Sequence, residues 1–328
     1  MSQTELLLGA GLDTPLPRLV LGTMTFGDTA DAATSRAMVD TALDAGISWL
    51  DTANGYAGTR TETILGEVLA GRRDRVSLAT KAGIYPSDAG GEPLLSRKGI
   101  RSSLEASLRR LDTDHVDLFY LHQPDRSVTV EETAEALADI VSAGMAKAVG
   151  VSNFAAWQIA DLAAACDRVG APRPVVAQQL YNLVARRVED EYAEFATTHG
   201  LATIVYNPLG GGLLTGRHSF DDAPGEGRFG SSALSSMYRD RYWNRSLFDA
   251  VDALATIASD AGLGLPELAL RWLLSRPLVN AVLLGGSKPD QLRANLAAAG
   301  RGPLSPDVVA ACDEVGATLA GPMPAYNR

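Results

Sequence analysis

The chain has 328 residues, of which 46% are hydrophobic and 21% charged, and its formal net charge is −10. This composition is typical of a globular protein and excludes a disordered chain, and the acidic balance argues against nucleic acid or an anionic membrane surface as a partner. Residues 1–10 lack the basic region and apolar run of a signal peptide, and no stretch reaches the ~18 apolar residues of a membrane helix. We therefore expect a cytoplasmic protein.

Along the chain, eight short apolar runs alternate with segments that carry apolar residues at helical spacing. Near-continuous apolar strands are what a parallel sheet covered on both faces requires. The predicted strands are Arg18–Gly22, Ser48–Asp51, Val76–Lys81, Val116–Leu121, Ala146–Val151, Val175–Leu180, Thr203–Tyr206 and Ala281–Leu284. The predicted helices are Thr34–Ala45, Arg97–Leu111, Glu131–Ala143, Ala155–Val169, Val188–His199 and Phe248–Ala261.

This alternation predicts an α/β protein, a closed (β/α)8 TIM barrel that forms a single domain over residues 1–328. A doubly wound sheet is the alternative, and it is disfavoured because no strand is followed by a G-x-G-x-x-G turn with an acidic partner ~20 residues later. Leu6–Leu8 and Leu16–Leu21 are predicted to form an N-terminal β-hairpin. Pro208–Asn244 is predicted to be a long loop after strand seven, at the face where barrel active sites lie.

Polar side chains that suit carbonyl chemistry follow the predicted strands. Asp51 ends the second strand and Tyr56 follows it, Lys81 ends the third strand, and His122 follows the fourth. Taken singly, each has an ordinary explanation as a turn cap, a surface side chain or a structural histidine. Their joint placement at successive strand ends favours one catalytic site instead.

Reduction of a carbonyl requires a proton donor for the developing alkoxide. A tyrosine has an ordinary pKa of ~10, and a nearby ammonium lowers it. We expect Lys81 to act on Tyr56 in this way, with Asp51 pairing and positioning the lysine. His122 is expected to hold the carbonyl oxygen.

Cysteine and histidine usage predicts no metal site. Cys166 and Cys312 are far apart in the sequence and fit no metal or redox spacing. We interpret them as buried free thiols of a protein from a reducing compartment.

The segment Asp51-Thr52-Ala53-x-x-Tyr56, together with Lys81 and His122, resembles the catalytic tetrad of the aldo-keto reductase superfamily in order and spacing. The resemblance continues through Gly150-Val151-Ser152-Asn153-Phe154 and the run 206–216, and it covers nearly the whole chain. It implies NADPH as the cofactor in preference to NADH. The residues that it assigns to the nicotinamide and pyrophosphate are Gly22, Thr23, Met24, Ser152, Asn153, Gln178, Tyr206, Asn207, Pro208, Leu209, Gly212, Leu214, Gly216 and Arg217.

Residues 285–295, after the last predicted strand, are similar to the adenosine-phosphate site of that family. Many members carry an arginine at the position of Gln291, and this chain does not. Recognition of a 2′-phosphate therefore depends on the neighbouring hydroxyl and ammonium groups. The residues that the resemblance places at this end of the cofactor are Gly286, Ser287, Lys288, Gln291 and Asn295.

Within the superfamily, Val116–Asp125, Met237–Trp243 and Pro324–Arg328 look like the aflatoxin-aldehyde and succinic-semialdehyde reductase branch. This implies reduction of small carbonyl compounds, with carboxylate-bearing aldehydes favoured because arginine pairs with carboxylates. The branch contains dimers, which implies a homodimer. The chain departs from the branch at Ala82–Gly91. The expected substrate contacts are Met24, Tyr85, Arg239, Arg241, Trp243 and Arg328.

Two other functions remain open. The chain is also similar to the regulatory β-subunits of potassium channels, which bind nicotinamide without a need for turnover. The same site residues would also serve oxidation of an alcohol or sugar, because the reaction is reversible.

Overall fold

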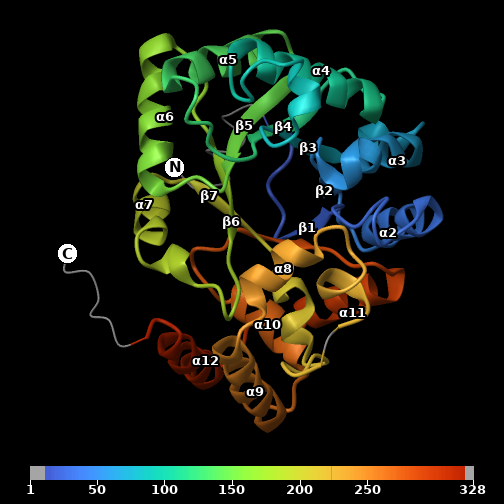
Figure 1. The fold of residues 1–328 in the computed structure, drawn as a ribbon, viewed down its shortest axis with the longest axis vertical. Helices are drawn as coiled ribbons and strands as arrows, with labels where there is room; N and C mark the ends of the chain where they lie inside the picture. Colours follow the sequence, from blue (N-terminus) through green and yellow to red (C-terminus); the bar gives the residue numbers. More distant parts are fainter. Residues whose placement is uncertain (1–11, 223, 322–328) are drawn as a thin grey trace. The chain divides into compact units, whose positions relative to one another are not determined.

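The computed structural model describes residues 12–222 and 224–321. Eight strands form a closed barrel in which each strand is parallel to its neighbours and the order around the barrel follows the chain. This confirms the predicted (β/α)8 architecture (Figure 1). The strands are β1 Leu19–Gly22, β2 Trp49–Asp51, β3 Ser77–Ala82, β4 Val116–Leu121, β5 Ala146–Ser152, β6 Val176–Leu180, β7 Ala202–Tyr206 and β8 Ala281–Leu284.

All eight strands lie within two residues of the predicted bounds. The helices are α2 Ala32–Asp44, α3 Arg60–Leu69, α4 Arg97–Leu111, α5 Val130–Ser142, α6 Ala156–Val169, α7 Tyr192–Thr198, α8 Ser235–Tyr242, α9 Arg245–Asp260, α10 Leu265–Leu274, α11 Pro289–Ala299 and α12 Pro306–Thr318.

Several helices begin where a short polar side chain satisfies a free backbone N–H of the first turn. Asp31 accepts from the Thr34 N–H at α2, Ser96 from the Gly99 N–H at α4, and Thr129 from the Glu132 N–H at α5. These caps fix the point at which each connection leaves the barrel rim and the helix starts.

Two of the predicted segments have a different form in the structure. The chain over Val188–His199 is a 3-10 turn at Arg187–Glu189 followed by the shorter helix α7. The predicted long loop Pro208–Asn244 contains 3-10 turns and the helix α8. For the predicted hairpin, Leu6–Leu8 lies outside the described residues, and Leu19–Leu21 belongs to barrel strand β1.

The chain divides into two compact units. The first holds the barrel and comprises the described chain up to Leu180, Val188–Tyr206 and Leu278–Arg293. The second comprises Tyr181–Arg187, Asn207–Pro277 and the described chain from Ala294. The single-domain prediction over residues 1–328 stays a prediction.

The barrel lumen is filled by alternate side chains of the strands, as the two-residue period of a strand requires. Trp49, Ala79, Tyr120 and Ile204 belong to this buried core. Gly150 leaves room for a large ring, because a Cβ there would lie 2.8 Å from the Tyr120 ring. In each strand, the next residues of this alternating, lumen-facing series lie at the carboxyl end of the barrel.

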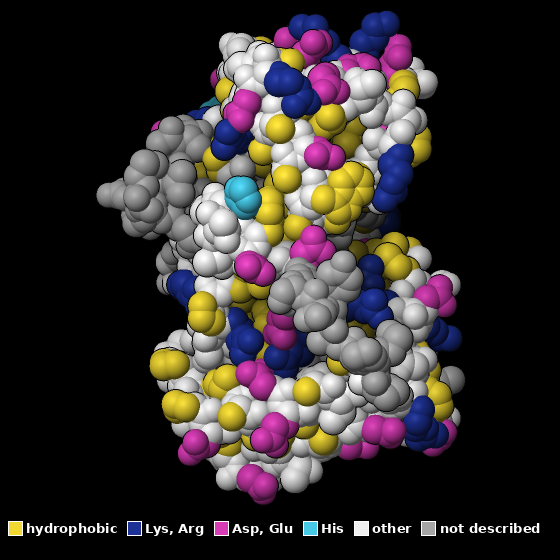
Figure 2. Space-filling model, turned by 90° about the vertical axis from the view of Figure 1, so that its left-hand side faces the viewer, with side chains coloured by type: hydrophobic (Ala, Val, Ile, Leu, Met, Phe, Trp, Pro, Cys, Tyr) yellow, Lys and Arg dark blue, Asp and Glu magenta, His cyan; other side chains and the backbone are white. Residues whose placement is uncertain are grey.

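On the face shown in Figure 2, Lys and Arg side chains are interspersed with Asp and Glu rather than gathered in one patch. Among the described residues, no single helix is long and apolar enough to cross a membrane. The pair α9 and α10, bent by 90°, passes that test by length and composition only.

Candidate active site

Three of the four predicted catalytic side chains are joined directly at the carboxyl end of the lumen. Lys81 continues the lumen-facing series of β3 and forms an ion pair with Asp51 at the end of β2. Its Nζ also donates to the Thr52 carbonyl oxygen at 2.8 Å and to the Tyr56 hydroxyl oxygen at 3.3 Å. Asp51 and Lys81 are buried, so this ammonium is directed at the phenol by fixed partners rather than by solvent.

The electrostatics of the pair keep a positive charge beside the phenol. Burial acts to lower the pKa of Lys81, but Asp51 and Tyr56 outweigh it and hold the pKa above its ordinary value. Burial raises the pKa of Asp51 against the effects of Lys81 and of Gln178, whose Nε2 donates to Asp51 Oδ2 at 2.9 Å. Lys81 therefore stays protonated throughout the neutral range.

Tyr56 begins a tight turn with an uncommon backbone. Ala57 and Thr59 have φ values of 46° and 79°, in the left-handed region that costs a non-glycine residue on the order of 1 kcal/mol. Backbone hydrogen bonds hold the entry to this turn: Thr52 N–H donates to Ala79 O at 2.9 Å, and Asn54 N–H to Lys81 O at 3.0 Å. The β2–β3 pairing thus continues past the strand end and fixes Tyr56 next to Lys81.

His122 lies beside the phenol. Its ring is 5.9 Å from the Tyr56 ring between centroids, in an edge-to-face arrangement, and its backbone N–H donates to Ala82 O at 2.8 Å. Burial, with a smaller contribution from Lys81, lowers the pKa of His122 to about 3. The imidazole is therefore neutral at physiological pH and offers one N–H donor and one acceptor.

The half-buried His122 makes stability depend on pH. The folded-state pKa lies below the ordinary value of 6.5, so the unfolded chain binds more protons between pH 3 and pH 6.5. Stability from this group is complete above pH 6.5 and is lost as the pH falls. We expect about 2 kcal/mol less stability at pH 4 than at pH 6 from His122 alone. Urea unfolding of the wild type and of His122→Gln at both pH values measures this loss of unfolding free energy. Equal losses in the two proteins would contradict it.

The side chains predicted to hold the nicotinamide amide lie at the ends of β5, β6 and β7. Tyr206 Oη donates to Asn153 Oδ1 at 2.6 Å, and Asn153 Nδ2 donates to His122 O at 2.9 Å and to Ser152 Oγ at 3.1 Å. Asn153 has a φ of 61°, in the left-handed region that asparagine tolerates better than most residues. Ser152, Asn153, Gln178 and Tyr206 are thereby connected to the catalytic residues.

Three predicted cofactor residues follow β1. Gly22 ends the strand, and the buried Thr23 donates its N–H at 3.0 Å and its hydroxyl at 2.9 Å to Asp51 O. Met24 comes next and is half-buried. Thr23 thus ties this segment to the strand end that carries Asp51.

The glycine-rich run after β7 forms a compact turn within the second unit. Gly211 and Gly212 have φ values of 69° and 109°, and the Asn207 side chain accepts from the Gly211 N–H at 2.7 Å. A Cβ on Gly211 would lie 2.5 Å from the Tyr238 ring, so glycine is required there. The predicted cofactor residues that share this turn or flank it are Asn207, Pro208, Leu209, Gly212, Leu214, Gly216 and Arg217.

The segment after β8 lies against a cavity of about 590 Å³. Gln291 holds this segment, because its Oε1 accepts from the Ser287 N–H at 3.0 Å and from the Ser287 hydroxyl at 3.2 Å. Ser287 and Lys288 line the cavity together with Arg60, a cation from α3 that the sequence did not suggest. Gly286 is bound by the Thr25 hydroxyl at 2.7 Å, and Asn295 lies further along α11.

The predicted substrate contacts are spread over both units. Tyr85 follows β3 in the first unit. In the second unit, Arg239 Nε donates to Phe229 O at 2.5 Å, and Trp243 Nε1 donates to Phe220 O at 3.1 Å. These bonds give Arg239 and Trp243 structural partners. Arg241 is half-buried on α8, and Arg328 lies outside the described residues.

Tyr120 is a further site residue that the sequence analysis missed. Its ring fills the lumen below the tetrad, with Lys81 Nζ 5.6 Å from the ring centroid, and its hydroxyl is buried. Burial, reinforced by the Asp51 charge, raises the pKa of Tyr120 well above its ordinary value. The signal was present in the alternation of β4, which places Tyr120 and Leu118 on the lumen side. Among the described residues, no group of three His, Cys, Asp or Glu side chains could hold a metal ion.

The chain forms a closed parallel barrel, and a buried lysine–carboxylate pair lies beside a tyrosine at its carboxyl end. This fold and site are those of a TIM-barrel oxidoreductase. Residues 18–317 match the Aldo/keto reductase family, and the chain belongs to it. Members of this family generally use NADP(H) and act on small carbonyl compounds.

Named relatives extend over almost the whole chain. Human aflatoxin B1 aldehyde reductase member 2 is 39% identical, over 96% of this chain and 91% of its own length. Human aldo-keto reductase family 7 member A3 is 38% identical, over 95% of this chain and 97% of its own. A probable voltage-gated potassium channel subunit beta from Oryza sativa subsp. japonica is 37% identical, over 87% of this chain and 88% of its own. The expected resemblance to the aflatoxin-aldehyde reductase branch is therefore confirmed.

Proposed function

We propose that the protein reduces aldehydes or ketones to alcohols with NADPH, and that Tyr56 is the proton donor. The observation that carries this proposal is the contact between Lys81 Nζ and the Tyr56 hydroxyl, with the same ammonium paired to Asp51. A hydroxyl faced by a fixed positive charge releases its proton more readily than a free phenol.

The residues fit a nicotinamide cofactor. Asn153 presents an exposed amide that Tyr206 and His122 hold in place, and amide groups of this kind orient a carboxamide. At the other end, Ser287, Lys288 and Arg60 border one cavity, which suits a phosphate group. When bound, a reduced nicotinamide supplies the hydride for the carbonyl carbon.

In the reaction, the chain's own side chains handle the carbonyl oxygen. The neutral His122 and Tyr56 are neighbours, with their ring centroids 5.9 Å apart, so both side chains could contact one carbonyl oxygen. His122 holds that oxygen, and Tyr56 transfers its hydroxyl proton to it as negative charge develops. Lys81 stabilises the resulting phenolate, and Asp51 keeps Lys81 in place.

The cofactor preference has a direct test at the ammonium group. Lys288→Met is expected to raise KM for NADPH about tenfold and leave KM for NADH within about twofold, because only NADPH carries the 2′-phosphate that the ammonium would bind. Arg60→Met is the parallel variant, because Arg60 lines the same cavity. An equal change for both cofactors would show that these cations do not read the 2′-phosphate.

We further propose that carboxylate-bearing aldehydes such as succinic semialdehyde are favoured. Arg241 is half-buried and has no carboxylate partner among the described residues, which leaves its guanidinium available for a substrate carboxylate. The buried free thiols Cys166 and Cys312 support the proposed reducing, cytoplasmic location. A homodimer is proposed from the reductase branch alone.

The experiment is NADPH consumption by the purified protein with succinic semialdehyde and with butyraldehyde, repeated with NADH. Turnover establishes the reductase. A preference for succinic semialdehyde that Arg241→Met abolishes supports carboxylate recognition. Tight NADPH binding with no turnover would favour a regulatory role of the kind named in the potassium channel subunit relatives.

A further inference from the structure

A second cluster of charged groups lies behind the tetrad, and the chemistry above does not use it. Arg110 on α4 contacts two carboxylates: Glu62 on α3 at 2.8 Å and Asp88 after β3 at 2.6 Å. The bond to Asp88 is bidentate, since Arg110 Nη1 also donates to Asp88 Oδ1 at 3.0 Å. Asn54 Nδ2 donates to Asp88 Oδ2 at 3.0 Å from the opposite side. Asp88 is thus held between a helix and the turn that leads to Tyr56.

The cluster is largely removed from water. The Glu62 side chain has no exposed surface, and those of Asp88 and Arg110 are 9% and 18% exposed. Burial raises the pKa of Glu62 against the hydrogen bond from Thr80 and the charge of Arg110. Because desolvation offsets much of the attraction between buried charges, such a cluster adds little stability over an apolar packing. The cluster is better explained by the position in which it holds the residues around it.

That geometry concerns the loop after β3. Asp88 lies in the 3-10 turn Pro86–Ala89, and the Ser102 hydroxyl also donates to the Asp88 carbonyl oxygen at 2.8 Å. A Cβ added to Gly55 would lie 3.3 Å from Ile84 and 3.5 Å from Tyr85. Ile84 and Tyr85 therefore lie against the residue that precedes Tyr56.

Ile84 is one of only three large hydrophobic side chains that are exposed in the described part of the chain, at 37%. An exposed apolar side chain against the residue that precedes Tyr56 is suited to contact an apolar group of a ligand. Asp88 ties the loop of Ile84 to the Tyr56 turn, because Asn54, two residues before Tyr56, donates to the Asp88 carboxylate.

We propose that Ile84 and Tyr85 form an apolar wall that selects carbonyl compounds with an apolar group next to the carbonyl carbon, and that Asp88 is the positioning residue for this wall. The proposal rests on the reductase function proposed above. Asp88 acts by holding the wall to the Tyr56 turn through Asn54 and to α4 through Arg110.

The kinetic test uses Asp88→Asn, which keeps the shape of the side chain and removes its charge. We expect kcat/KM for hexanal to fall about tenfold, mainly through KM, and kcat/KM for acetaldehyde to change less than about threefold. In the background Ile84→Ala/Tyr85→Ala, Asp88→Asn should have no further effect on hexanal, because the wall is already removed. Equal losses for both aldehydes, or an undiminished effect in that background, would overturn the proposal.

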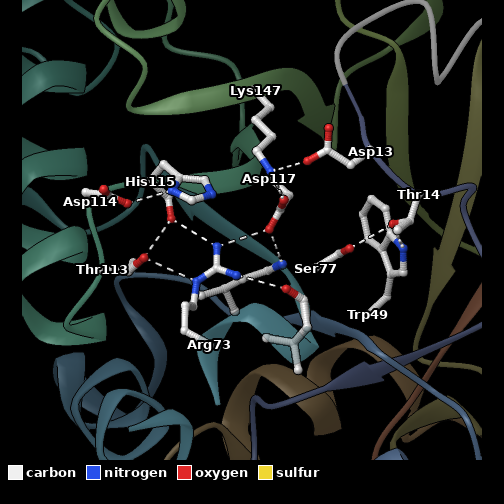
Figure 3. Close-up of polar contacts among 12 residues, drawn as sticks. Asp13, Thr14, Trp49, Arg73, Ser77, Thr113, Asp114, His115, Asp117 and Lys147 are labelled. Atoms are coloured by element: carbon white, nitrogen blue, oxygen red, sulfur yellow. Dashed lines mark hydrogen bonds and ion pairs between the residues drawn. The ribbon is translucent and has the colours of Figure 1, made fainter. Parts of the chain in front are cut away.

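The matched control is Asp117→Asn, near the start of β4 and so at the amino end of the barrel. Figure 3 shows the polar contacts of Asp117. Asp117 accepts from the Arg73 guanidinium at 3.1 Å, from the Leu78 N–H at 2.8 Å and from Lys147 at 2.9 Å, so it is also a carboxylate held by an arginine and a neighbouring donor. This variant should lower the melting temperature without changing the ratio of hexanal to acetaldehyde activity.

A second measurement does not depend on turnover. Amide hydrogen exchange in Asp88→Asn should become faster in residues 83–95 and unchanged in β3 and β4, whereas Asp117→Asn should spare residues 83–95. Unchanged exchange in residues 83–95 would overturn the positioning role. If the wild type reduced no aldehyde, the reductase proposal would fail while this exchange result still decided the role of Asp88.

Discussion

Replacing Tyr56 with phenylalanine is expected to lower kcat by at least ~10²-fold, because it removes the hydroxyl that Lys81 contacts at the mouth of the barrel. Packing should change little, since the phenylalanine ring keeps the edge-to-face contact with His122. The loss should therefore appear in kcat, with the affinity for NADPH close to that of the wild type. Steady-state rates and fluorescence titration of NADPH measure the two quantities separately.

Tyr192→Phe is the matched control. Its hydroxyl is also buried in the first unit, where it shares a hydrogen bond of 2.8 Å with Thr203, but it lies outside the proposed site. This variant should lose about 1 kcal/mol of stability and keep its turnover. A Tyr56→Phe protein with near-normal turnover would remove Tyr56 from the role of proton donor.

The barrel could be predicted because its strands are short apolar runs with clear polar boundaries. In each strand the period of two decides which side chains enter the lumen, so Asp51 and Lys81 follow from Trp49 and Ala79. The four candidate catalytic residues could be proposed from the sequence for a related reason, since all strands of a parallel barrel end on one face.

Elements with weaker periodicity were missed. Helix α10 is short, with seven of its ten residues buried, so it offers few turns over which a helical period can be recognised. Helix α3 was missed next to the unusual backbone of residues 57–59, which no local sequence signal announces.

Contacts between side chains far apart in the sequence could not be predicted from the sequence either. Asp88 and Arg110 are 22 positions apart and meet only because α4 returns along the barrel to the loop that follows β3. Arg60 reaches the cavity of Ser287 and Lys288 because the first and last strands of a closed barrel are neighbours. In each pair, an ordinary charged residue gains its role from closure of the fold, and no motif surrounds it.

Lys81→Met is expected to destabilise the protein by about 3–5 kcal/mol, because it leaves the carboxylate of Asp51 buried without its countercharge. Gln178 would remain as a donor to Asp51, at 2.9 Å, but a neutral amide does not replace an ammonium. The variant should also lose most of its turnover, since no cation then faces Tyr56. Chemical unfolding and steady-state rates measure the two losses.

The pH dependence of this loss identifies its cause. In Lys81→Met, burial without an opposing charge raises the folded-state pKa of Asp51 further above its unfolded value, so the folded state retains a proton that the unfolded chain releases. The stability of the variant relative to the wild type should therefore increase as the pH is lowered from 8 to 5. The double variant Lys81→Met/Asp51→Leu should recover most of the stability and none of the turnover. If the double variant were as unstable as Lys81→Met, the loss would come from packing of the lysine chain and not from the buried charge, and the ion pair would owe its place in the barrel to catalysis alone.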